Sequence, residues 1–149
     1  MRISLGGTRQ IAATPERVWA RLLDPAALTE GSSAIESIEV IAPHHFRVTV
    51  AVGFAFFKLK VPVDVQHTDL VEPTSGTMRV TGEAMGTTVS ATAKFKIHPE
   101  GTGIRLDWHA DGEATGKLAS AAGNALEGTA RKLAEDFWDD FAAKVTRGA

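Results

Sequence analysis

The sequence contains no cysteine. The chain therefore forms no disulfide, no thiolate metal site and no cysteine nucleophile. A chain without cysteine suits a reducing compartment, and we expect a cytoplasmic protein.

The sequence also lacks a hydrophobic run of the ~20 residues needed to span a bilayer. Its densest apolar stretch, residues 48–57, is short and is interrupted by Thr49 and Gly53. The N-terminus shows no apolar segment followed by a cleavage site of small residues, so no secretory signal is predicted. We expect peripheral membrane contact at most.

No charge of one sign dominates, since 16 basic residues stand against 18 acidic ones and the formal net charge is -2. No segment gathers enough lysine or arginine to follow a phosphate backbone, which argues against nucleic acid as a partner. The hydrophobic fraction of 44% is ordinary for a globular protein. A length of 149 residues suits a single ligand-binding domain over residues 1–149.

Groups that could perform catalysis or bind metal are scarce. None of the histidines stands at a metal-ligand spacing; they are His44, His45, His67, His98 and His109. Carboxylates near the C-terminus stand four residues from basic residues, as in ion pairs on an exposed helix face: Glu127 with Arg131, Arg131 with Glu135, and Lys132 with Asp136. We therefore predict no metal, no cofactor and no catalytic residue, and we do not expect an enzyme.

The order of the predicted elements indicates an α+β fold. Residues 1–11 read as a strand, and Thr14 with Pro15 is typical of a helix start. Asp24-Pro25 ends this short helix, and a second short helix is predicted over residues 26–30.

From residue 37 onward apolar and polar residues alternate, which predicts half-buried antiparallel strands. Short turns separate strands over 77–84, 88–98 and 103–114, and a long helix follows after residue 116 and runs to about residue 145. These elements predict a curved antiparallel sheet of about seven strands, wrapped around the long C-terminal helix, with two short helices after the first strand. This arrangement is a helix-grip fold.

The inward face of this sheet is predicted to be bulky at one end and thin at the other. A turn over residues 99–102 predicts that Ile97 pairs with Ile104 and that Ala91 lies opposite Ala110. Large apolar side chains then gather near the turn, and glycine and alanine gather at the far end.

The long helix repeats the same gradient along its length. Its apolar face, centred on Leu126, carries Ala119, Ala122 and Gly123 first and larger side chains such as Phe137 later. Because this helix begins where the last strand ends, the small residues of helix and sheet should meet in space.

Such a meeting produces either a close approach of backbones or a cavity. We favour a cavity, because a curved sheet cannot follow a straight helix along its whole length. An empty void of ~300 Å³ would cost several kcal/mol at ~24 cal/mol per Å³, which favours occupancy by an apolar ligand. The predicted ligand-binding residues are Phe54, Phe56, Met78, Val80, Gly82, Ala91, Ala93, Trp108, Ala110, Gly112, Ala119, Ala122, Gly123 and Leu126.

Residues 53–58 form a predicted turn that holds three of the seven phenylalanines. These rings either pack in the core or form an apolar lip that gates the pocket or touches a membrane or partner.

Residues 115–124 (TGKLASAAGN) and 130–138 (ARKLAEDFW) resemble the signature of the CoxG family of carbon monoxide dehydrogenase subunits. Val18-Trp19 and Leu23-Asp24-Pro25 also resemble that family's first helix and the stop after it. The resemblance covers nearly the whole chain, and the family belongs to the START-like SRPBCC superfamily of helix-grip proteins. It implies a cavity for a lipid- or quinone-like molecule and an accessory role beside a molybdenum hydroxylase of the carbon monoxide dehydrogenase type.

Two other functions stay open. One is an enzyme of the polyketide cyclase or hydrolase type, which would need His67, Asp64 or Glu83 to point into the cavity. The other is a protein-interaction adaptor for a larger oxidoreductase, which would not depend on the cavity.

Overall fold

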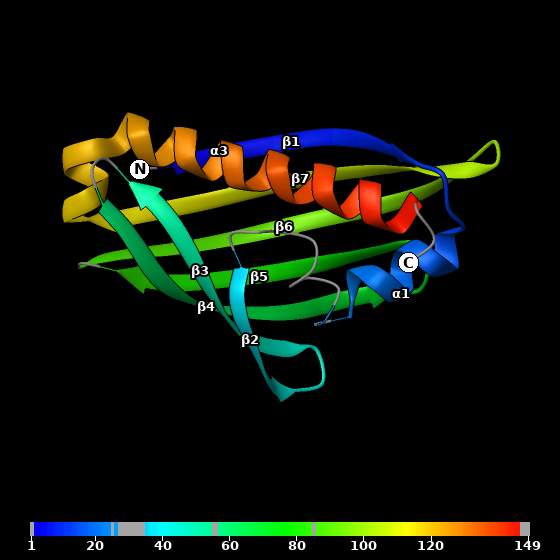
Figure 1. The fold of residues 1–149 in the computed structure, drawn as a ribbon, viewed down its shortest axis with the longest axis horizontal. Coiled ribbons are helices and arrows are strands. Elements are labelled where there is room, and N and C mark those ends of the chain that lie inside the picture. The colour runs from blue at the N-terminus through cyan, green and yellow to red at the C-terminus, as the bar shows by residue number, and fades with distance from the viewer. Residues whose placement is uncertain (1, 25, 27–34, 55–56, 85, 147–149) are drawn as a thin grey trace.

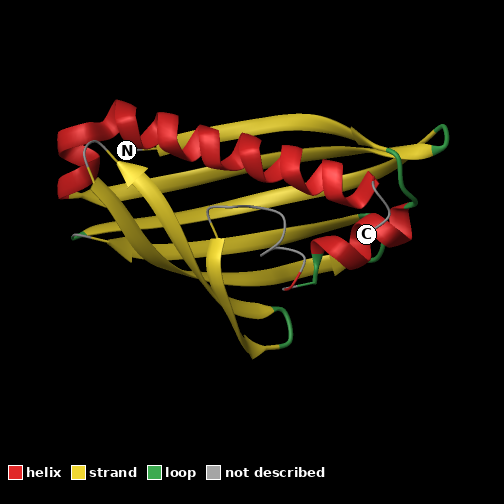
Figure 2. Cartoon of the chain, viewed as in Figure 1, coloured by secondary structure: helices red, strands yellow, loops and turns green. Residues whose placement is uncertain are grey.

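The computed structural model of the chain describes residues 2–24, 26, 35–54, 57–84 and 86–146. They form a seven-stranded antiparallel sheet with both described helices on one side of it (Figures 1 and 2). The elements are β1 (Arg2–Ile11), α1 (Pro15–Leu22), β2 (Ile35–Ala42), β3 (His45–Phe54), β4 (Phe57–Val71), β5 (Ser75–Ala84), β6 (Thr87–Glu100), β7 (Gly103–Gly116) and α3 (Lys117–Thr146). The predicted α+β helix-grip fold is confirmed.

The sheet is a meander from β2 to β7, and β1 pairs with the outer edge of β7. Figure 1 shows β2, β3 and β4 bending toward the side that carries α3. Helix α3 lies against β1, β7 and β6, and also against β3 on the other side of the bend. The curved sheet therefore holds the helix from two sides. We call the face toward α3 the inner face.

The hairpin between β6 and β7 is tighter than the sequence predicts. Ile97 pairs with Leu106 rather than with Ile104, because the turn is centred one residue later than predicted, with Gly101 and Thr102 between the paired residues Glu100 and Gly103. Gly101 stands in that turn with φ +61°, a conformation that glycine adopts without a steric penalty. The predicted pairing was wrong by two positions, and a shift of two leaves every side chain on its predicted face.

The observed pairing sets two cross-strand rows across the inner face. The first row is His67, Met78, Ala93, Ala110 and Leu5. The second row is Val65, Val80, Ala91, Gly112 and Ile3. The small residues of β6 and β7 are therefore direct neighbours, although Ala91 faces Gly112 and not Ala110 as predicted.

The start of α1 follows the predicted chemistry. Thr14 is the N-cap, and its side chain accepts a hydrogen bond from the backbone N–H of Arg17 at 3.2 Å. Pro15 fills the first helical position, where no backbone N–H is needed. Of the second short helix expected over 26–30, residues 27–30 lie outside the described residues.

Helix α3 follows β7 without a loop. Gly116 joins the two elements with φ +127°, which L side chains rarely adopt, so the direct passage from strand to helix depends on glycine. This short connection fixes the first turn of α3 beside the end of β7.

The core fills the end of the inner face near α1. Ile97 and Ile104 are each 2% exposed and Leu106 is fully buried. The rings of Trp19 from α1 and Phe95 from β6 lie 5.9 Å apart. We call this region the closed end.

Arg9 ties β1 to the second half of α3. Its Nη2 donates to Glu135 Oε2 at 2.6 Å, and its Nε donates to Asp139 Oδ1 at 3.0 Å. Glu135 therefore binds Arg9 across the two elements, whereas the helical spacing predicted a pair with Arg131. A single exposed ion pair contributes little to stability, but here one arginine binds two carboxylates at the contact between helix and sheet.

The closed end should dominate stability. We expect Val18→Ala, which removes a fully buried side chain of α1, to lower the free energy of unfolding by about 2 kcal/mol. Val40→Ala is the matched control, since Val40 is 58% exposed, and it should cost less than about 1 kcal/mol. Urea denaturation followed by tryptophan fluorescence measures both, and equal losses would show that this core assignment is wrong.

Candidate functional site

Along its strands the inner face is buried at the closed end, partly exposed in the middle, and buried again at Thr87 (3% exposed) and Ala114 (1% exposed). Beyond the closed end lie small or slender side chains that are partly exposed although they face α3. Val89 is 38% exposed, in contrast to Leu106 at 0% on the same face. These residues, which we call the small-residue region, are Met78, Val80, Gly82, Val89, Ala91, Ala93, Ala110 and Gly112. Their described neighbours do not close this part of the inner face.

The glycines of this region are tight within the sheet. A Cβ added to Gly112 would lie 3.3 Å from both Ala91 Cβ and Ser90 O. A Cβ added to Gly82 would lie 3.3 Å from Pro62 O on the adjacent strand. Among the described residues, the contacts that favour glycine at these two positions come from neighbouring strands.

Aromatic side chains of α3 border the small-residue region. Phe137 packs against the cluster of Phe46, Val48 and Val65 on β3 and β4. The next residue, Trp138, stacks on Trp108 of β7 with ring centroids 5.8 Å apart. The second half of α3 thus contacts the inner face at two places across the bend, on β3 and β4 and on β7.

Seven of the predicted ligand-binding residues lie together in the small-residue region: Met78, Val80, Gly82, Ala91, Ala93, Ala110 and Gly112. Trp108 lies on the same face but is only 6% exposed and belongs to the buried core. Phe56 lies outside the described residues. The side chains of five more predicted residues are not among those described: Phe54, Ala119, Ala122, Gly123 and Leu126. The apolar lip at residues 53–58 and the contribution of α3 to the ligand site therefore stay predictions.

His67 adds a polar group to the inner face. It continues the alternation of β4 and lies directly opposite Met78, and it is 7% exposed. Its Nδ1 is enclosed and has no hydrogen-bond partner among the described residues. Its ring stands edge-on to Phe46, with centroids 5.3 Å apart. Burial lowers the pKa of the His67 imidazole to about 4, and the charge of nearby His44 adds to this effect.

The sequence left three candidates for a polar group inside the cavity, and the structure separates them. His67 points to the inner face, as the strand alternation of Val65 and His67 would indicate. Asp64 lies on the outer face, where His45 Nε2 stands 2.7 Å from its Oδ1. Glu83 is exposed on the outer face of β5.

Trp108 Nε1 is a second enclosed polar atom without a hydrogen-bond partner among the described residues. It lies over β1, since a Cβ added to Gly7 would come within 3.0 Å of it. With its ring stacked on Trp138, this N–H faces the closed core rather than the small-residue region.

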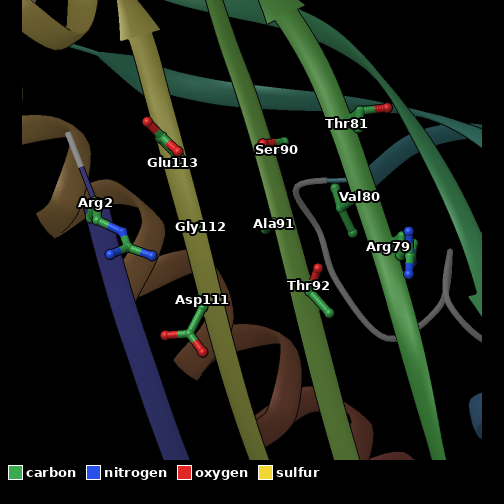
Figure 3. Close-up of a pocket in the computed structure, with 10 residues that line it drawn as sticks. All are labelled: Arg2, Arg79, Val80, Thr81, Ser90, Ala91, Thr92, Asp111, Gly112 and Glu113. Carbon is green, nitrogen blue, oxygen red and sulfur yellow. The ribbon is translucent and has the colours of Figure 1, made fainter.

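A hollow of about 290 Å³ lies over the outward-pointing side chains of the same strands (Figure 3). Its lining residues come from β1, β5, β6 and β7: Arg2, Arg79, Val80, Thr81, Ser90, Ala91, Thr92, Asp111, Gly112 and Glu113. Charged side chains of both signs and hydroxyl groups stand among these residues, and a hydrogen bond from Ser4 lowers the pKa of Asp111. This polar outer hollow differs in character from the apolar pocket predicted from the sequence.

No three histidine, aspartate or glutamate side chains gather as metal ligands would within the described ranges. Within the same ranges, no helix combines the length and apolar character needed to cross a membrane.

Solved structures match this fold over nearly its whole length. A conserved protein from Geobacillus kaustophilus gives a TM-score of 0.86 at 24% sequence identity, covering 99% of this chain and 96% of that one. A START superfamily protein from Mycobacterium smegmatis gives 0.73 at 16% identity, with coverages of 98% and 99%. The protein TTHA0849 from Thermus thermophilus gives 0.69 at 17% identity, also covering 98% and 99%. These similarities confirm the START-like fold.

No curated protein matches the sequence. Residues 7–146 do match a family profile, and this range includes α1, the whole sheet beyond the start of β1, and α3 to its last residue. The segments that first suggested the relationship, in α1 and α3, lie inside it. The chain therefore belongs to the CoxG family of carbon monoxide dehydrogenase subunits.

Proposed function

We propose that this protein binds and carries a hydrophobic small molecule, lipid- or quinone-like, between the inner face of the sheet and α3. The observation that carries the proposal is the contrast along one sheet face. Leu106 is fully buried at the closed end, whereas Val89 and its small neighbours remain accessible on the same face.

Physical chemistry supports an occupant at this place. Apolar surface that faces inward and stays wet forfeits ~25 cal/mol per Å², and an apolar ligand would recover that free energy. Walls of alanine, valine, glycine and methionine select a ligand by size and shape, as in other apolar pockets. A bound molecule would thereby bury the apolar surface that the small-residue region leaves exposed.

We further propose that the protein is a carrier rather than an enzyme. Among the described residues of the small-residue region and its first row, the titratable side chain is His67. General acid–base catalysis usually needs a second group that orients or complements the histidine, and Asp64 and Glu83 both face away. An enzyme of the cyclase or hydrolase type remains the second candidate, because His67 points inward.

Membership of the CoxG family supports an accessory role beside a molybdenum hydroxylase of the carbon monoxide dehydrogenase type. In this proposal the protein acts in the cytoplasm and contacts a membrane peripherally at most. A pure interaction adaptor would use the same partner but would not need an occupied cavity.

Filling the small-residue region should abolish binding. We expect Ala91→Trp to weaken the affinity for an apolar dye such as 1-anilinonaphthalene-8-sulfonate at least tenfold, because the indole would occupy the space beside Gly112. Ser90→Trp is the matched control, since its side chain lies on the opposite face. Ala93→Leu provides a smaller filling variant, and thermal melts check that each variant folds. Unchanged dye affinity in both folded filling variants would contradict the proposed site.

Native mass spectrometry of protein purified from its source should detect a passenger of lipid or quinone size in the wild type. The passenger should be missing from Ala91→Trp, because the space is filled, and retained in Ser90→Trp. A wild-type chain that is uniformly empty and also rejects apolar dyes would sink the carrier hypothesis.

The accessory role makes a separate prediction. A pull-down with this protein should retain the molybdenum hydroxylase, and Ala91→Trp should leave that complex intact because the substitution points inward. A wild-type protein that retains no such enzyme would overturn the accessory role and leave the ligand site untouched.

His67 should make the fold sensitive to acid. Its pKa is about 4 in the folded state against an ordinary 6.5, so the unfolded chain takes up the proton first as pH falls. The contribution of neutral His67 is fully present above pH 6.5 and is lost between pH 6.5 and 4, on the order of 2 kcal/mol after allowance for solvent screening. We expect His67→Phe to flatten this part of the stability–pH profile relative to the wild type. Denaturant titrations from pH 4 to 8 compare the two proteins.

A further inference from the structure

His67 differs from His98 and His109 in the face of the sheet that it occupies. His98 and His109 lie on the outer face beside Asp107 and Asp111, at 3.2 Å and 2.9 Å. His67 instead lies on the inner face, within a row that continues through Met78 and Ala93. A polar side chain that is 7% exposed normally has a hydrogen-bond partner, and its Nδ1 has none among the described residues.

The enclosed nitrogen indicates which tautomer the ring adopts. A neutral imidazole carries one N–H, and a buried N–H without an acceptor is rarer and costlier than a buried lone pair without a donor. Since Nδ1 is enclosed and has no acceptor among the described residues, the proton belongs on Nε2. Nε2 is the ring nitrogen farther from the backbone, so His67 carries its hydrogen-bond donor at the end of the side chain.

We infer that His67 is the polar anchor of the ligand site, and that the ligand is an apolar molecule carrying an oxygen acceptor, such as a carbonyl, that accepts a hydrogen bond from His67 Nε2. This inference rests on the proposed binding function and adds the chemistry that would distinguish one apolar ligand from another. A donor in an apolar pocket rejects a pure hydrocarbon, because binding it would leave the N–H unpaired.

Trp108 is the other side chain with an enclosed, unpartnered nitrogen, and it does not compete for this role. Its Nε1 lies over Gly7 at the β1 side of the sheet, and its ring is stacked on Trp138. His67 lies toward β3, in direct register with Met78 of the small-residue region. The polar end of the ligand is therefore expected near β4, with its apolar part over β5, β6 and β7.

A pair of probes of nearly equal shape tests this assignment. 2-Acetylnaphthalene carries a carbonyl acceptor, and 2-isopropylnaphthalene has a methyl group in place of the carbonyl oxygen, on a saturated carbon. We expect His67→Phe to weaken binding of 2-acetylnaphthalene about tenfold, the size of one net hydrogen bond, and to change binding of 2-isopropylnaphthalene less than about threefold. His67→Gln places an amide N–H near the position of Nε2 and should restore most of the lost affinity. His109→Phe on the outer face is the matched control.

Isothermal titration calorimetry measures the affinities, and ¹⁵N NMR of the His67 ring in the wild type reports the tautomer without any substitution. Equal weakening of both probes in His67→Phe, or a ring protonated on Nδ1, overturns the anchor while the ligand site stands. If neither probe binds the wild type, the proposed binding function fails and the anchor fails with it.

Discussion

The structure depends on the grip of the curved sheet on the second half of α3. Phe137 packs into the β3–β4 cluster, and its neighbour Trp138 stacks on Trp108 of β7. Two adjacent residues thus hold the helix against opposite sides of the bend, and Arg9 adds a polar tie from β1. Large aromatic contacts fix the distance between helix and sheet at this point. Because a helix is stiff, that distance is set for its earlier turns as well.

Because the distance between helix and sheet is fixed, small side chains on the inner face leave space between the two layers. At the closed end, Leu106 and its neighbours fill the space between the layers completely. Farther along the strands, Ala91 and Gly112 are direct neighbours and leave the inner face accessible. A sheet and helix held apart in this way cannot collapse onto short side chains, so the described residues leave part of an apolar surface uncovered. Binding a hydrophobic molecule is the function that this arrangement supports best.

The chemistry of the inner face is set by which strand positions point inward. The charged residues of β7 all alternate to the outer face, where Asp107 and Asp111 pair with His98 and His109. His67 is a polar side chain on the inner face of β4, and burial lowers the pKa of its imidazole so that it stays neutral near pH 7. An uncharged hydrogen-bonding group in an apolar wall can pair with a polar substituent of a ligand, which is the role proposed for His67.

Local patterns in the sequence determined the element order, the inward faces and the helix start at Thr14, because strand alternation, caps and turns act over a few residues. The same patterns grouped seven of the predicted ligand-binding residues correctly on the inner face, since an error of two positions in the β6–β7 pairing preserves the face. Only the tertiary structure decided the register itself, the placement of Trp108 in the buried core and the enclosure of His67. These depend on a two-residue turn, on a helix distant in sequence and on the sheet's curvature, and no local stretch of sequence specifies such long-range geometry.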